Sequence, residues 1–483
     1  MKPRLLLAWL LVLVSVLAAC GRHADEGGGG TPAPTAKETE TRATEAKAEE
    51  TAADQAPEPS PLDEAIRSVL VDRKEVSISF WTGTGAANFP VLEEMVRAFQ
   101  QQYPNIKVDF SNQGPLAELT DKLTQNIVAK STPTLSNLDA STFPEYIASG
   151  AIVDLLPYYE HPEIGLAGKA TDPFSYYIDE VKSFSPQGTM YGFPTNKKTA
   201  DVLVYNKTYF DAKGWEPPAT WDDVVRYAKA IKEETGKPGF SFDNAYGDAP
   251  FALLSRQWGS PYIRDDGAID IDNEAGRAAL KFYRENMDLG YFTMPALLPS
   301  AGGKYSSNGF VKEETYMFVG AAAGIQFAIP NPESGHSSFE IGVAPVPQKD
   351  PGNPVYYSKG ENYAIFSNST EEERVAAWLL IAFLTDPGQN VNWLIRTGNL
   401  PISQAMLDEP EYRNFLDAEA DNTPEYYRAA AVKAVLSVDK LTFNKAIPKS
   451  AALAEAVGQM WEAVMIGGGD PDKLLSETAA KLQ

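Results

Sequence analysis

The sequence predicts an α/β fold of two lobes joined by several crossovers. The chain has 483 residues, too many for one ordinary domain, and its composition, 43% apolar and 11% aromatic, is that of a globular protein. Short apolar strand patterns alternate with helical patterns near its start. A polar stretch then separates two strands near the middle of the chain. Together these features indicate one α/β lobe followed by a passage into a second.

The first lobe is predicted from a regular alternation of strands and helices. Strands are expected at 76–80, 106–110 and 133–139, and helices at 91–103 and 116–129. The first helix pattern places its apolar residues on one face, as a helix that covers a sheet requires. Strands separated by helices pair in parallel, so this order predicts a parallel α/β lobe.

The passage between lobes is predicted at the stretch Gly188–Lys207. Pro194 cannot donate to a central ladder, residues 195–199 are polar, and a strand is expected at 201–205. A strand, a polar crossover and a second strand are typical of a chain that leaves one lobe for another. Clefts between domains bind ligands, so we expect a binding site beside this crossover.

The rest of the chain is divided between the lobes by further crossings, which we expect near Tyr316 and Asp386. Lobe one then comprises about 66–196 and 318–387, and lobe two about 200–315 and 388–483. Helices are expected from the N-cap residues Thr220 and Thr370, each followed by an acid at the third helical position, and over 249–257 and 274–289. Strands are expected at 314–319, 341–347 and 363–366.

The acidic segment 265–273 has the residue types of a calcium loop. Counted from Asp270, however, Ala275 stands where such a loop needs glycine. We therefore expect a surface hairpin there, and no metal.

The N-terminus is predicted to be a lipoprotein signal followed by a tether. Lys2 and Arg4 precede an apolar run that ends at Leu-Ala-Ala-Cys20, similar to the lipobox whose cysteine is lipidated; an ordinary signal with a chance cysteine is the alternative. Residues 21–61 contain no large apolar side chain, so the segment to about residue 65 is expected to be disordered. We therefore expect an extracytoplasmic protein that Cys20 anchors to the membrane.

Charge and composition argue against several classes of protein. A formal net charge of −23 is unsuited to nucleic acid, and a single cysteine leaves no disulfide.

The segment Gly83–Asn88 follows a strand as a dinucleotide turn would, but Asn88 replaces the third glycine. His23, His161 and His336 lack the spacing of a helical zinc site. No catalytic residue and no cofactor are expected, although 65 acids leave a two-carboxylate glycan-cleaving enzyme open.

Several short motifs lie in a fixed order along the chain: Ser149–Leu155, Tyr191–Pro194, Val202–Lys207, Pro218–Trp221 and Thr397–Ile402. In this order they resemble extracellular solute-binding protein family 1, the sugar and glycerol-3-phosphate binding lipoproteins of ABC importers. The resemblance implies a type II periplasmic-binding-protein-like fold. It also implies a monomer that closes on a solute and delivers it to a membrane permease.

Candidate ligand-binding residues follow from the resemblance and from sugar chemistry. The resemblance places Asp139, Gly360 and Asn399 at ligand or cleft positions. Sugars need aromatic faces and planar hydrogen-bonding groups. The full candidate set is Trp81, Thr82, Asp139, Asn196, Lys197, Lys198, Trp258, Gly360, Glu361 and Asn399. For each tryptophan a role in the core stays open.

The charge of the solute is left open by the sequence. Lys197 and Lys198 could neutralise a phosphate or carboxylate, or could be a solvated crossover. The arginine of the phosphate binders is not matched around Ser450. We therefore expect a carbohydrate, with glycerol-3-phosphate or another anionic polyol as the alternative. A ligand-sensing receptor is a further alternative.

Overall fold

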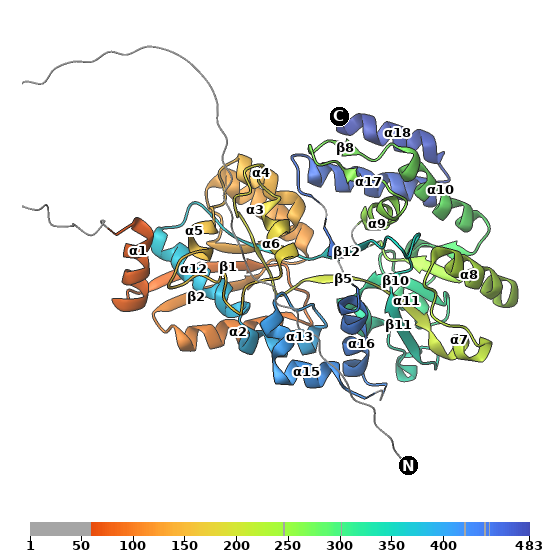
Figure 1. Cartoon of the computed structure of the whole chain (residues 1–483), viewed down its shortest axis with the longest axis horizontal. Helices are drawn as coiled ribbons and strands as arrows, with labels where there is room; N and C mark the ends of the chain where they lie inside the picture. Colours follow the sequence, from red (N-terminus) through yellow and green to blue (C-terminus); the bar gives the residue numbers. More distant parts are fainter. Residues whose placement is uncertain (1–58, 245–246, 301, 420–421, 439–440, 444) are drawn as a thin grey trace, which may run out of the picture. The chain divides into compact units, whose positions relative to one another are not determined.

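A computed structural model describes residues 59–483, apart from 245–246, 301, 420–421, 439–440 and 444 (Figure 1). The predicted signal, Cys20 and the tether up to Glu58 lie outside the described residues. Helix α1 (Pro61–Ile66) begins the described part, and Ser60 and Asp63 form its capping box. Ala65 and Ile66 are buried, so the ordered protein begins a few residues earlier than predicted. No helix within 59–483, those gaps aside, is long and apolar enough to cross a membrane.

The first sheet has the strand order β2-β1-β3-β13-β4. Its strands are β1 (Val76–Thr82), β2 (Ile106–Asn112), β3 (Leu135–Leu138), β4 (Phe193–Pro194) and β13 (Asn362–Ile365). Strand β1 pairs in parallel with β2 and β3, as predicted, and β13 adds antiparallel pairing on β3 and β4. The alternation of strands and helices in the sequence therefore predicted the parallel part of this sheet, and the antiparallel pairing of β13 with β3 and β4 was not predicted.

Helices pack on the first sheet through their apolar side chains, α2 along one face and α12 on nearly all sides. Helix α2 (Phe89–Gln102) buries Val91, Leu92, Met95, Val96 and Phe99 in the core. Helix α12 (Glu371–Leu384) contacts β1 and α2, and its predicted capping box between Thr370 and Glu373 is confirmed. The other helices in this part are α3 (Leu116–Ala129), α4 (Phe143–Ala148), α5 (Leu156–Tyr159), α6 (Ser175–Lys182), α13 (Pro387–Thr397), α14 (Gln404–Asp408) and α15 (Pro410–Leu416).

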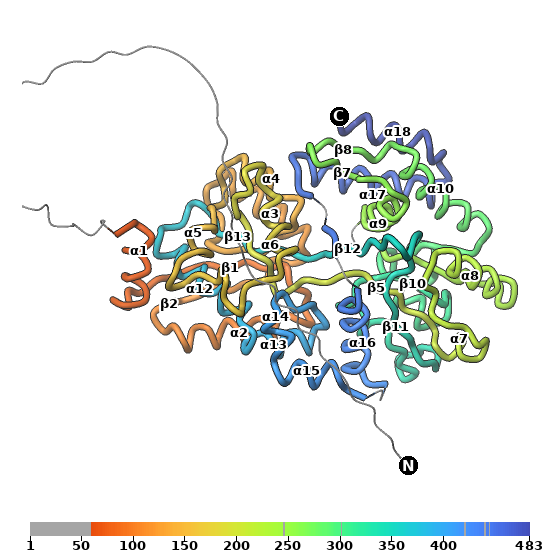
Figure 2. The backbone as a smooth tube through the Cα atoms, viewed as in Figure 1, coloured from red at the N-terminus to blue at the C-terminus, as the bar shows by residue number. Residues whose placement is uncertain are grey.

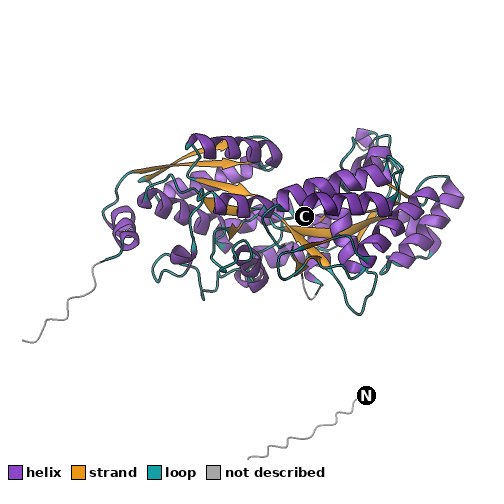
Figure 3. Cartoon of the chain, turned by 90° about the horizontal axis from the view of Figure 1, so that it is seen from above, coloured by secondary structure: helices purple, strands orange, loops and turns teal. Residues whose placement is uncertain are grey.

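The second sheet has the order β14-β12-β5-β10-β6-β9, and β11 also pairs with β5. Its strands are β5 (Thr199–Asn206), β6 (Phe240–Phe242), β9 (Phe292–Thr293), β10 (Met317–Ala321), β11 (Ile341–Pro345), β12 (Tyr356–Lys359) and β14 (Leu441–Thr442). All eight residues of β5 are buried, which suits a strand with neighbours on both edges. Figure 3 shows helices flanking the strands.

The helices around the second sheet begin and end as local sequence signals require. Helix α8 (Trp221–Thr235) has the predicted capping box of Thr220 and Asp223, and it ends at Gly236 in the left-handed conformation. The others are α7 (Lys207–Lys213), α9 (Ala249–Gln257), α10 (Glu274–Asp288), α11 (Ser307–Phe310), α16 (Pro424–Leu436), α17 (Ser450–Met465) and α18 (Pro471–Leu482). The hairpin predicted at 265–273 is confirmed by β7 (Tyr262–Ile263) and β8 (Ile269–Asp270).

The chain passes between the sheets at neighbouring strands. The first passage, from β4 to β5, lies at the polar crossover that the sequence predicts. The return runs from β12 to β13 through Gly360 and Glu361. Helix α16, which contacts α13 and α15 as well as β5 and β11, then leads the chain back to β14 in the second sheet. Strands β14, β12 and β5 are adjacent in the sheet, and Figure 2 shows β5 and β12 side by side.

The crossings predicted near Tyr316 and Asp386 are wrong. Strand β10, which begins at Met317, pairs with β5 and β6 and so stays in the second sheet. Asp386 caps helix α13, which contacts α2 and α12, so the chain remains beside the first sheet there. The apolar side chains of these segments could be buried against either sheet. Only the elements that each segment contacts show to which sheet it belongs. The lobe boundaries drawn at these two crossings, near residues 318 and 387, are therefore wrong as well.

Candidate functional site

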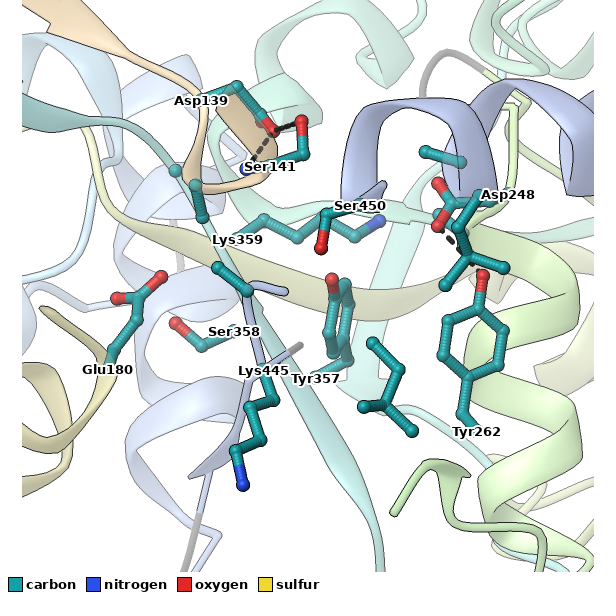
Figure 4. Close-up of a pocket in the computed structure, with 17 residues that line it drawn as sticks. Asp139, Ser141, Glu180, Asp248, Tyr262, Tyr357, Ser358, Lys359, Lys445 and Ser450 are labelled. Atoms are coloured by element: carbon teal, nitrogen blue, oxygen red, sulfur yellow. Dashed lines mark hydrogen bonds between the residues drawn. The ribbon is translucent and has the colours of Figure 1, made fainter. Parts of the chain in front are cut away.

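A cleft is lined by residues from both sides of the crossings (Figure 4). Asp139, Ser141 and Glu180 come from the part of the chain that forms the first sheet. Residues of α9, the β7–β8 hairpin and α17 line the opposite side, and β12 with Gly360 forms a wall between them. Helix α17 also contacts the turn at Ala140–Thr142, so both sides of the cleft meet there.

Asp139 lies at the carboxyl end of β3, where ligands of parallel α/β sheets bind. Its Oδ1 accepts hydrogen bonds from the Ser141 backbone N–H at 2.9 Å and from the Ser141 hydroxyl at 2.6 Å. These bonds fix the carboxylate at the cleft surface, as the dashed lines in Figure 4 show.

Asp248 lies across the cleft from Asp139, just before helix α9. The Tyr262 hydroxyl donates a hydrogen bond of 3.2 Å to its Oδ2. Burial raises the pKa of Asp248 to about 6, and the negative charge of Asp139 contributes to the rise, whereas Lys359 and Arg256 oppose it. The negative charge of Asp139 therefore reaches Asp248 across the cleft.

Arg256 lies behind this wall and stacks on two tyrosines. Its guanidinium carbon is 4.7 Å from the ring centroid of Tyr262 and 5.7 Å from that of Tyr357. Burial lowers the pKa of Arg256. The arginine thus stiffens the aromatic wall.

Lys359 lines the cleft but its charge is paired. Its Nζ is 2.6 Å from Oδ1 of Asp201, which is 5% exposed on the adjacent strand β5. Such a pair of buried charges costs much of its Coulomb energy in desolvation. It holds the lysine chain along the cleft wall.

Comparison with known proteins gives the family. Residues 94–420, more than half of the chain, match the family model of bacterial extracellular solute-binding proteins. The chain belongs to this family.

Relatives of this solute-binding protein include sugar and glycerophosphate binders. The arabinooligosaccharide-binding protein of Halalkalibacterium halodurans is 24% identical over 342 residues, 68% of this chain and 72% of that protein. The sn-glycerol-3-phosphate-binding periplasmic protein of Brucella abortus is 30% identical over 173 residues, 35% of this chain and 39% of that protein.

Solved structures of similar fold extend over most of the chain. Maltose-bound MalE3 of T. maritima has a TM-score of 0.68 at 20% identity, covering 84% of this chain and 98% of that one. UgpB of Mycobacterium tuberculosis in complex with glycerophosphocholine has a TM-score of 0.69 at 20% identity, with the same coverage. These structures show that the α/β architecture predicted from the sequence is the two-lobe fold of periplasmic binding proteins.

The two lysines of the first crossover are both paired with carboxylates. Lys198 is fully buried, and its Nζ donates to Glu180 at 2.7 Å and to Asn362 Oδ1 at 3.0 Å. Lys197 forms an ion pair with Glu361 of the return crossover, and Asn137 donates to the same carboxylate. These ion pairs connect the first crossover to neighbouring segments, and each lysine is neutralised by a carboxylate.

The other amides of the crossover region hold backbone in place. The Asn196 carbonyl accepts from the Trp393 indole at 2.6 Å, and its side chain accepts from Tyr363 at 3.0 Å. The Asn399 amide, oriented so that its oxygen accepts from Thr397, donates to the carbonyls of Lys197 and Lys198 at 3.2 and 3.3 Å.

The predicted aromatic candidates lie away from this cleft. Trp81 is half-buried in β1 against the first core, and Thr82 beside it is buried with its hydroxyl 2.8 Å from that of Thr84. Trp258 packs on Phe282, with ring centroids 4.8 Å apart. Their roles in ligand binding stay predictions.

Of the predicted residues, Asp139 and Gly360 line the cleft. Gly360 has φ 129°, and a Cβ there would lie 2.7 Å from the Lys197 carbonyl oxygen, so glycine is required. Sequence reasoning missed Asp248, Tyr262 and Tyr357, because no local pattern places them opposite Asp139. In the described part of the chain no group of three or more His, Cys, Asp or Glu could hold a metal ion.

Proposed function

We propose that this protein binds a carbohydrate in the cleft and delivers it to the permease of an ABC importer. The observation that carries the proposal is the cleft itself, where carboxylates of both sides converge with the tyrosines Tyr262 and Tyr357. Such groups suit sugar hydroxyls, and the arabinooligosaccharide-binding relative supports the same class of solute. Both sides contribute contacts, so a bound sugar favours the closed arrangement.

Binding without chemical conversion is part of the proposal. Members of the matched family bind solutes, and the carboxylates Asp139 and Asp248 would accept hydrogen bonds from hydroxyls. An enzyme would instead convert an oligosaccharide. Incubation with oligosaccharides followed by chromatography distinguishes the two, and released sugar would contradict the proposal.

An anionic polyol is the second candidate, and the partial match to a glycerol-3-phosphate-binding protein favours it. The charges around the crossover oppose it. Lys197, Lys198 and Lys359 each have a carboxylate partner, so none offers an unpaired cation to a phosphate. A phosphate in the cleft would also be repelled by Asp139 and Asp248.

Retention at the membrane is proposed to depend on Cys20. Replacement of Cys20 by serine removes the thiol that a lipid would occupy. We expect the C20S protein to move from the membrane fraction to the soluble fraction of the expressing cells. Unchanged membrane association would contradict lipid anchoring while leaving solute binding untouched.

A thermal-shift screen tests the proposed solute class. Mono- and oligosaccharides, polyols and glycerol-3-phosphate are added to the purified protein at millimolar concentration, and a bound solute raises the melting temperature. We expect a carbohydrate to raise it and glycerol-3-phosphate to leave it unchanged. A shift with glycerol-3-phosphate alone would favour the second candidate, and no shift with any solute would contradict both.

A further inference from the structure

Asp139 and Asp248 face the cleft without an ion pair. Within the described residues the Asp139 carboxylate accepts hydrogen bonds only from its neighbour Ser141 and that of Asp248 only from Tyr262, and neither forms a salt bridge. The two residues belong to opposite sides of the cleft, and Figure 4 shows both at its edge. A ligand that enters therefore meets negative charge on both sides.

The cations nearest to Asp139 and Asp248 already interact with other groups of the protein. Lys359 is paired with Asp201, and Lys198 with Glu180. The guanidinium of Arg256 is stacked between tyrosine rings, and Lys445 at the rim donates to the Asp265 carbonyl at 2.7 Å. The cleft thus neutralises its other buried acids and leaves Asp139 and Asp248 for a partner from outside.

A second observation also points to a missing ligand group. The hydroxyl of Ser358, which is 5% exposed, lines the same cleft. Its oxygen has no hydrogen-bond partner by strict geometry within the described residues, although it lies close enough to the Tyr177 hydroxyl to lower the pKa of that tyrosine. A buried hydroxyl without a partner costs about 1–3 kcal/mol, so a polar ligand group is expected to complete its hydrogen bonding.

We propose that the solute is a saccharide that carries an ammonium group, as an amino sugar does, and that Asp139 and Asp248 bind this group together. The inference rests on the proposed function and narrows its class of solute. An ammonium ion offers three donors and a positive charge to two carboxylates, and charge-assisted hydrogen bonds are about twice as strong as neutral ones. Since each carboxylate belongs to a different side, the cation also joins the sides and stabilises closure.

The titration of Asp248 supports this geometry. Burial and the charge of Asp139 raise its pKa to about 6 in the empty cleft. The other groups that face it are the Tyr262 hydroxyl and the cations of Lys359 and Arg256. A bound ammonium ion favours the charged carboxylate, so binding of an amino sugar should weaken as the pH falls through about 6.

Matched pairs of sugars test the inference by calorimetric titration. Glucosamine is compared with glucose, galactosamine with galactose, and the β-1,4-linked glucosamine disaccharide with cellobiose. Members of each pair differ only in ammonium against hydroxyl. At pH 6.5 we expect at least one amino sugar to bind roughly tenfold or more tightly than its neutral partner, with the preference shrinking at pH 5.

Two variants assign the preference to the acids. Asp139→Asn and Asp248→Asn keep acceptor oxygens for Ser141 and Tyr262 while removing the charge. Each is expected to lower the affinity for the amino sugar much more than that for its neutral partner, and so to remove most of the amino-sugar preference. Asp222→Asn, at an exposed acid in α8, is the matched control and should change neither. Melting temperatures show whether each variant is folded.

The outcomes separate this inference from the proposed function. Neutral sugars that bind as tightly as their amino partners overturn the ammonium site and leave the carbohydrate receptor intact. A preference that survives in both asparagine variants also overturns it. Failure of every sugar to bind, whatever its charge, overturns the proposed function itself.

Discussion

The crossings and the cleft wall both hold charged residues away from bulk water, but they treat charge in opposite ways. At the crossings Lys197, Lys198 and Lys359 each meet a carboxylate. In the cleft wall, Asp139 and Asp248 accept hydrogen bonds from hydroxyl and amide donors, and neither forms a salt bridge within the described residues. Charge that is paired within the protein supports the fold, whereas charge left unpaired in a cleft is available to a ligand.

The largest expected effect comes from breaking a crossing pair. Lys198→Met leaves Glu180, which is 4% exposed, as a buried charge without its cation. We expect a loss of about 3–5 kcal/mol in the free energy of unfolding, measured by urea denaturation. The double variant Lys198→Met/Glu180→Gln should recover a large part of this loss. Equal stability of the single variant and the parent would show that the pair is not structural.

A substitution at Gly360 tests the return crossing and is expected to have a smaller effect on stability. Gly360→Ala forces a Cβ into contact with the Lys197 carbonyl at φ 129°, and we expect a loss of roughly 1–3 kcal/mol in unfolding free energy. Gly85→Ala is the matched control, because a Cβ at that position would have nothing within 4 Å of it. If Gly360→Ala and Gly85→Ala have the same melting temperature, the fold does not require the glycine conformation at residue 360.

Unlike the substitutions above, replacement of Asp248 is expected to raise the stability of the protein at neutral pH. Its pKa is raised from 3.8 to about 6, so the folded state binds the proton more tightly than the unfolded state. Stability is therefore lost as the pH rises from about 4 to 6. Since the residue borders the cleft, we expect Asp248→Asn to be more stable than the parent at pH 7 by about 1–2 kcal/mol, with no gain at pH 3.5. Thermal unfolding across this pH range measures the difference, and a gain that does not vary with pH would contradict it.

A surface ion pair gives the smallest expected effect. Lys207 and Asp211 form an i,i+4 pair with exposed side chains. Lys207→Ala should change the melting temperature by no more than about 1 °C, because solvent screens such pairs. Lys207→Ala and Lys198→Met each remove one ion pair, but only the Lys198 pair is buried. If both variants lose similar stability, burial is not the cause of the large loss expected for Lys198→Met.

Local elements could be predicted from the sequence because their signals are local. Helices 116–129 and 249–257 have the predicted bounds, and the capping boxes at Thr220 and Thr370 are confirmed. These features depend on the order of neighbouring residues. The first crossover was predicted for the same reason, since polar residues interrupt two strands.

The candidate site depends on contacts that the sequence does not encode locally. Lys197 and Lys198 read as unpaired cations because their partners Glu361 and Glu180 lie far away in the chain. Asp248 carries no motif, and only the packing of α9 brings it opposite Asp139. The return crossing was misplaced because Met317–Val319 is apolar enough for either sheet, and pairing with β5 decides the matter.

The adjacent order of β14, β12 and β5 has a mechanical consequence. The passages between the sheets lie on neighbouring strands, so they define a single line. A rotation about that line can leave the pairing of β12 with both neighbours in place, whereas sliding or twisting across it would break this pairing. Closure on a solute, as proposed, should thus be a one-axis rotation that returns Asp139 and Asp248 to the same mutual position each time.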